Sequence, residues 1–165
     1  MAPLVAVFDG EQGAVFTTTD GVVVNVPPQG VSGSFIITLT PVPPQSGLPG
    51  DVLMHSFRLD ALLNGVPIAV LSQPVTIQLP VDVSIVPSGE RPWLYTWTAD
   101  GGLPSAVQTT DGDRSSVSGR WALVPGQSYD AVAQEVTVAL KPMNLYALST
   151  VLIRDYWFSL VPVLQ

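Results

Sequence analysis

The chain of 165 residues has no cysteine, one histidine and few charged side chains. Without cysteine it can form neither a disulfide framework nor a thiolate metal site. His55 is its only imidazole for acid–base catalysis or zinc binding. Only 12% of the residues are charged, about half the fraction of an average soluble domain. We therefore expect much of the outer surface to be covered, by further copies of the chain or by another matrix.

The few charges are mostly acidic, which limits the partners. Thirteen Asp and Glu residues stand against six Lys and Arg, giving a formal net charge of −7. Nucleic-acid binding depends on basic side chains that neutralise phosphates, so we expect no nucleic-acid partner. No apolar run is long enough for a membrane-spanning helix, although 47% of the residues are hydrophobic. Residues 1–9 lack the basic start of a signal peptide, so we expect an intracellular protein or a chain without its leader.

Short β-branched runs between prolines and glycines predict an all-β fold. Such punctuation at about every eight to twelve residues is typical of sandwiches and barrels. Asn64-Gly65 is the strongest turn signal, because both central residues of a type I′ turn need positive φ. We predict one antiparallel β-sandwich, ZU5-like or Ig-like, with extra apolar strands at both termini. The expected strands are residues 22–26, 34–40, 52–63, 66–71, 75–79, 93–98, 116–123, 132–140, 145–148 and 151–160.

Five segments together resemble ZU5-like domains, which are β-sandwich modules of bacterial cell surfaces. They are residues 13–31, 57–61, 71–77, 93–97 and 144–149. The first has the expected order of a glycine, a short strand, Asp20-Gly21, an apolar strand and a Pro-x-Gly-Val ending. The resemblance implies an antiparallel sandwich that serves as an extracellular structural or interaction module. It divides the chain into an N-terminal apolar strand (1–12), a sandwich (13–150) and a C-terminal apolar strand (151–165).

Some eukaryotic relatives of these domains cleave themselves at a His-Phe-Ser tripeptide just before the last strand, with serine as the nucleophile. The matching positions here hold Pro142, Met143 and Asn144. Because the nucleophile and its aromatic neighbour are both absent, we expect no self-cleavage by that chemistry.

Other signs of chemistry in the sequence are weak. Strict alternation puts His55 on one strand face with Leu53 and Phe57, which predicts a half-buried, hydrogen-bonded side chain. Asp111 and Asp113 offer oxygen ligands, but the acidic residue that completes an EF-hand loop is missing. A polar turn is the better interpretation, and calcium binding stays open. We predict no enzyme, no catalytic residue, no cofactor and no metal site.

Three aromatic residues, Trp93, Tyr95 and Trp97, occupy alternate positions and so share one face of a strand. Exposed, they would form a platform on which sugar rings could stack. Buried, they would belong to the core or to cross-strand aromatic packing. The sequence favours packing but leaves both interpretations open.

Both ends of the chain are apolar on both strand faces, a pattern that calls for burial on both faces. Either each end pairs with the edge of its own sandwich, or one end completes the sheet of a neighbour. The candidate donor strand is Leu4, Val5, Ala6, Val7 and Phe8. The alternative interface strand is marked by Val151, Ile153, Tyr156, Trp157 and Phe158.

The sequence thus predicts a non-enzymatic structural subunit of an extracellular assembly, such as a fibre, pilus or surface layer. Its partners would be copies of itself, joined by β-strand addition, and head-to-tail repetition would give an open filament. Lysine, which blunts many sheet edges, occurs only at position 141. The N-terminal strand is the favoured donor by analogy with strand-donating pili. The alternative is a carbohydrate-binding or adhesion module with polysaccharide as its partner.

Overall fold

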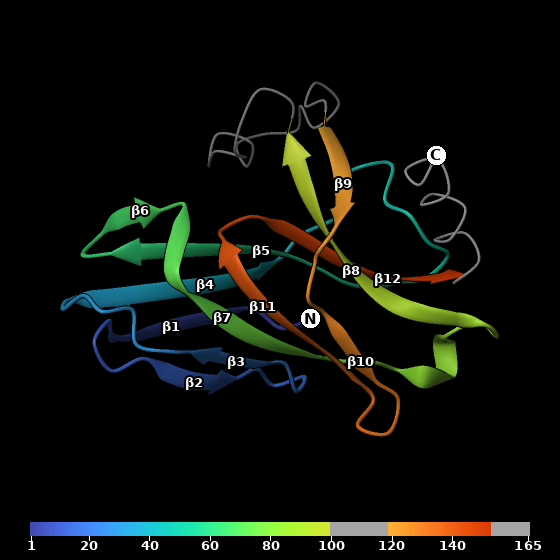
Figure 1. Cartoon of the computed structure of the whole chain (residues 1–165), viewed down its shortest axis with the longest axis horizontal. Helices are drawn as coiled ribbons and strands as arrows, with labels where there is room; N and C mark the ends of the chain where they lie inside the picture. Colours follow the sequence, from blue (N-terminus) through green and yellow to red (C-terminus); the bar gives the residue numbers. More distant parts are fainter. Residues whose placement is uncertain (100–118, 153–165) are drawn as a thin grey trace.

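A computed structural model describes residues 1–99 and 119–152 and shows the predicted antiparallel β-sandwich (Figure 1). Apart from one short 3-10 turn, η1 (Val83–Ile85), the regular elements of the described residues are strands. The strands are β1 (Leu4–Asp9), β2 (Ala14–Thr17), β3 (Val23–Val26), β4 (Ser34–Pro41), β5 (Leu53–Leu63), β6 (Val66–Ile68), β7 (Val70–Pro80), β8 (Glu90–Ala99), β9 (Gly119–Leu123), β10 (Ser128–Asp130), β11 (Glu135–Pro142) and β12 (Leu145–Leu152).

The strands form two sheets. Sheet A has the order β1–β4–β5–β12–β8–β9, with β6 also paired to β5. Sheet B has the order β10–β11–β7–β3–β2. The edge strands β1 and β2 follow each other in the chain, and the ring centroids of Phe8 and Phe16 lie 5.9 Å apart between them. This contact closes one side of the sandwich.

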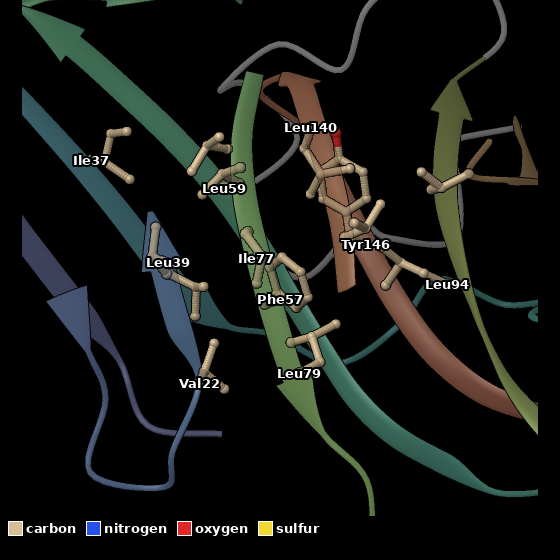
Figure 2. Packing of buried hydrophobic residues seen from close by; sticks show 14 of the residues in the cluster. Val22, Ile37, Leu39, Phe57, Leu59, Ile77, Leu79, Leu94, Leu140 and Tyr146 are labelled. Carbon is tan, nitrogen blue, oxygen red and sulfur yellow. The ribbon is translucent and has the colours of Figure 1, made fainter. Parts of the chain in front are cut away.

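The core lies between the sheets and follows the alternation in the sequence. Figure 2 shows Ile37 and Leu39 of β4 beside Phe57 and Leu59 of β5, with Ile77 of β7 facing them from sheet B. All five side chains are fully buried. Each such burial contributes roughly 1.5–3 kcal/mol, so this interface between sheets is the main source of stability.

The predicted turn at Asn64-Gly65 is confirmed, with φ values of 50° and 80°. The predicted return strand 66–71 is wrong, because it is split between two sheets. β6 pairs with β5 in sheet A, whereas β7 pairs with β11 in sheet B. The chain crosses at Ala69, whose carbonyl accepts a hydrogen bond from the Met143 N–H (2.8 Å).

The predicted strand 132–140 begins three residues late, at Glu135. The Asp130 carboxylate accepts hydrogen bonds from the N–H groups of Val132 (2.8 Å) and Ala133 (2.9 Å), which forms a local turn. Gln134 follows with a φ of 56°. Side-chain capping of the turn therefore outweighs the β propensity of Val132.

The predicted strands 145–148 and 151–160 are joined in one strand, β12, within the described residues. β12 pairs with β5 on one side, with a register shift between Leu148 and Ser149, and with β8 on the other. Residues 116–118 and 153–160 of the predicted strands lie outside the described part of the chain.

Candidate subunit interface

The candidate donor strand is the edge strand of its own sheet. β1 pairs with β4 along its whole length. Leu4, Ala6 and Phe8 face the interior, and the Phe8 ring stacks on Phe35 with centroids 5.4 Å apart. β1 therefore fills a place in its own subunit. Donating it to a neighbour would take Ala6 and Phe8 out of the sandwich.

The other side chains of β1 point outward into solvent. Val5 is 67% exposed and Val7 is 63% exposed. Val7 lies opposite Ile36 of β4, which lies opposite Leu62 of β5, and Val5 lies opposite Thr38. Directly paired residues share a sheet face, so these five side chains form one outward surface. We call the surface of Val5, Val7, Ile36, Thr38 and Leu62 the bare half of sheet A.

The opposite half of the same outer face is covered. The outward residues of β12 and β8 alternate with core residues, yet they are buried: Ala147, Ser149, Tyr95 and Trp97. Residues 42–52 run over this surface. The Trp121 indole N–H donates to the Gln45 carbonyl (3.1 Å), and the Ser149 hydroxyl donates to the Pro49 carbonyl. We call the surface of Ala147, Ser149, Tyr95, Trp97 and Trp121 the covered half.

The predicted aromatic row lies within the covered half. Tyr95 is 7% exposed and Trp97 is 3% exposed. Trp97 packs edge to face with Trp121 at 5.5 Å, and the Arg91 guanidinium lies 4.0 Å from the centre of the Trp93 ring. The interpretation as an exposed platform is therefore wrong for Tyr95 and Trp97, and the rings pack across strands instead.

The alternative interface strand falls mostly outside the described residues. Val151 is buried near the end of β12, opposite Arg91 of β8. Outside the described residues lie Ile153, Tyr156, Trp157 and Phe158, and also the candidate calcium ligands Asp111 and Asp113.

His55 is half-buried and hydrogen-bonded, as the alternation of β5 predicted. Its Nε2 donates to the Pro80 carbonyl of sheet B (2.8 Å), so the ring ties the two sheets together. Nδ1 is buried without a hydrogen-bond partner among the described residues. Burial lowers the pKa of His55 below its usual 6.5, which favours the neutral ring.

A cavity of about 210 Å³ opens beside His55 at the end of the sandwich. Its lining is Asp20, Met54, His55, Pro80, Asp82 and Ile85. Hydrogen bonds from Ser84 lower the pKa of Asp82, so this carboxyl is ionised near neutral pH. The imidazole of His55 bonds a backbone carbonyl and not a carboxylate or a hydroxyl. Among the described residues, no hydroxyl or carboxylate is hydrogen-bonded to this imidazole, so the cavity shows no Ser-His pair.

Residues 1–99 and 119–152 contain neither a metal-binding cluster nor a membrane-spanning helix. No group of three or more His, Asp or Glu side chains in these ranges is placed to hold a metal ion. No helix in the same ranges is long and apolar enough to cross a membrane.

Sequence reasoning missed three members of the bare half, Ile36, Thr38 and Leu62, of which Ile36 and Leu62 are apolar. The signal was present in residues 34–40, where Phe35, Ile37 and Leu39 alternate inward. Ile36 is an apolar residue at a position that alternation assigns to solvent. The sequence could not show that Ile36 lies between Val7 and Leu62, because this depends on which strands pair and in what register.

Comparison with protein-family models, with curated proteins and with solved structures finds no match to this chain. The resemblance to ZU5-like domains therefore stays a prediction.

Proposed function

We propose that this chain is a non-enzymatic structural subunit that joins copies of itself by β-strand addition at the bare half of sheet A. The assembly would be extracellular, such as a fibre, pilus or surface layer. The observation that carries the proposal is the edge strand β1, six residues long, with Val5 and Val7 mostly exposed. Natural edge strands are usually protected by lysine, proline, a bulge or short length. β1 carries no lysine or proline and pairs with β4 without a register shift.

The contrast with the covered half supports the same proposal. There, residues 42–52 shield the outward side chains of β12 and β8. No described residue shields Val5 or Val7 in the same way. A second copy would complete the burial that the low charge content of the chain calls for, because contact would remove apolar surface from water.

Light scattering over a range of protein concentrations, with electron microscopy of the products, tests the proposal. We expect the native chain to associate, and the double variant Val5→Lys/Val7→Lys to stay monomeric. Two lysines on an edge strand oppose pairing through both charge and solvation. The matched control is Val83→Lys/Val132→Lys, which adds the same charge at exposed positions in η1 and in the turn after β10, where Val132 is 95% exposed.

The control variant should associate as the native chain does. A native chain that stays monomeric at every concentration would overturn the proposal. So would a Val5→Lys/Val7→Lys variant that associates as readily as the control.

A further inference from the structure

We infer that the free edge of β1 accepts a single extended segment from a second copy, through the backbone groups of Val5 and Val7. The inference rests on the proposed function and specifies its contact. β1 is then the receiving strand, because its inward side chains hold it in its own sheet.

The hydrogen bonds around β1 show which of its backbone groups face β4. The Gly10 N–H donates to the Gly33 carbonyl (3.1 Å), immediately after the last ladder pair of β1 and β4. On the other side of β4, the Asn64 N–H donates to the Ser34 carbonyl (2.8 Å). Ser34 thus points its carbonyl to β5, so the odd-numbered residues of β4 point theirs to β1. Both observations give the same alternation.

This alternation divides the backbone of β1 into two sets. The N–H and C=O groups of Leu4, Ala6 and Phe8 face β4, while those of Val5 and Val7 face the free edge. No strand of the described residues other than β4 pairs with β1. Val5 and Val7 therefore offer two donors and two acceptors, spaced as an incoming strand requires.

The edge ends at the turn that follows β1. The Asp9 carbonyl accepts hydrogen bonds from the N–H groups of Gln12 and Gly13, both at 3.1 Å. This carbonyl is therefore already used within its own subunit. The acceptor edge is centred on Val5 and Val7 and is long enough for a short segment.

The position of β2 favours a lone segment over the edge of another sandwich. Figure 1 shows β3 and β2 lying outside β1 on this side of the molecule. A second sandwich that approached β1 edge-on would bring its own second sheet against β2. A single segment has no second sheet and so avoids this contact with β2. It would lie with one face toward Phe8 and the partly exposed Phe16, and the other toward Val5 and Val7.

Such a segment must be apolar on both faces and free of acidic residues near the end of β1. Asp9 and Glu11 are both exposed there and would repel an acidic partner. A second copy can supply this chemistry, because only 12% of its residues are charged. Its sequence at 156–160 has apolar residues at both alternate sets of positions and no charge.

Hydrogen exchange of single backbone amides gives the first test, on the native full-length chain. The Val5 and Val7 amides should exchange quickly in the monomer and slow at least about tenfold on assembly. The Ala6 and Phe8 amides should be protected in both states. The internal control is the pair of Val15 and Thr17 amides on the free edge of β2. The Thr18 N–H donates to the Val22 carbonyl, so the same alternation turns these two amides away from β3.

A pair of variants at Val7 gives the second test. Val7→Pro removes one outward N–H and leaves the ladder to β4 intact, since proline is tolerated on an edge strand whose N–H faces solvent. Val7→Thr shortens the apolar surface but keeps the N–H. We expect Val7→Pro to lose assembly and Val7→Thr to retain it, with similar unfolding midpoints for both monomers.

The outcomes separate this inference from the proposed function. A native chain that never assembles overturns both. If the chain assembles while the Val5 and Val7 amides still exchange quickly, or if Val7→Pro assembles as well as Val7→Thr, the acceptor edge is wrong. Self-association at the bare half would then survive through side-chain contacts, without strand addition at β1.

Discussion

The two halves of the outer face of sheet A place apolar residues outward, yet only one half is covered by described residues. Ala147 is 0% exposed in the covered half, whereas Val5 is 67% exposed in the bare half. Alternation along the strands gives no hint of this difference, because it assigns both residues to the outside. What differs is the cover that the chain itself supplies. An apolar outward position thus becomes core or candidate interface according to the loops around it.

The composition of residues 42–52, which cover this half, lowers the conformational entropy that the segment loses on folding. Residues 42–52 include Pro43, Pro44 and Pro49, whose fixed φ lowers the entropy that an ordered segment loses on folding. Backbone hydrogen bonds then fasten its end to β12. The Asp51 N–H donates to the Thr150 carbonyl (2.9 Å), and the Thr150 N–H donates to the Val52 carbonyl (3.0 Å). No comparable segment of the described residues reaches β1.

The largest predicted effect comes from a substitution at Gly50 that displaces residues 42–52 from the covered half. Gly50 has a φ of 108°, and a Cβ there would lie 2.4 Å from the Thr150 carbonyl oxygen. Gly50→Ala should therefore displace residues 42–52 and lower the free energy of unfolding by about 3 kcal/mol. Trp97 and Trp121 would become more exposed. Urea unfolding measures the loss of stability, and a red shift of tryptophan fluorescence reports the exposed rings.

Gly47 is the matched control in the same segment. Its φ is also positive, at 82°, but a Cβ there would meet nothing within 4 Å. Gly47→Ala should cost only the backbone strain, about 1 kcal/mol, and leave the fluorescence unchanged. Equal losses from the two variants would show that backbone strain alone accounts for both, and that the covered half does not depend on this contact.

A smaller effect is predicted on the bare half, from the residue that holds β1 in place. Phe8 stacks on Phe35 and also meets Phe16. Phe8→Ala should lower the free energy of unfolding by about 2 kcal/mol, below the range for a fully buried ring because Phe8 is partly exposed. Val7→Ala, on the same strand but facing solvent, should change it by no more than about 0.5 kcal/mol. Thermal unfolding of the two variants at low concentration compares them.

The reverse ranking would count against the structure of this edge. If Val7→Ala cost more than Phe8→Ala, the register of β1 would be shifted by one residue, since a one-residue slip exchanges the two faces.

The strands were predictable from sequence wherever one local signal dominated. The run 34–40 places Phe35, Ile37 and Leu39 at alternate positions, and Asn64-Gly65 specifies its turn by positive φ. The sequence could not show that the chain changes sheet at Ala69, where the carbonyl accepts a hydrogen bond from Met143 in the distant connection between β11 and β12. Long-range pairing has no local signature.

The candidate site shows the same division. The sequence singled out Val5 and Val7 as part of an apolar strand, and the structure leaves them exposed. It also offered Tyr95 and Trp97 as an exposed platform, and they are buried. The aromatic residues were placed on the correct strand, but their burial comes from packing with Trp121 and from the surrounding covered half. Sequence alternation gives the face of a residue and not what lies over it.

The smallest predicted effect is the pH dependence of stability that His55 causes. His55 lies on β5, the strand between the bare half and the covered half. His55 faces inward from β5, and burial lowers its pKa below 6.5. The folded chain therefore binds a proton less readily than the unfolded chain does, so the stability of the fold is complete above about pH 6.5 and falls as the pH drops toward the lowered value. The pKa values of Asp20, Asp82 and Asp130 are lowered from 3.8, so the stability that these three carboxyls contribute is lost mainly below about pH 5, outside the range from pH 7 to pH 5 in which His55 acts. His55→Gln keeps a donor for the Pro80 carbonyl and removes the titration. Its free energy of unfolding, from urea titrations at pH 7 and pH 5, should be nearly the same at both values, whereas that of the native chain should fall. An equal slope in the two proteins would mean that the inward face of β5 is open to water at His55, and that the interior beneath the two halves is not as dry as its burial indicates.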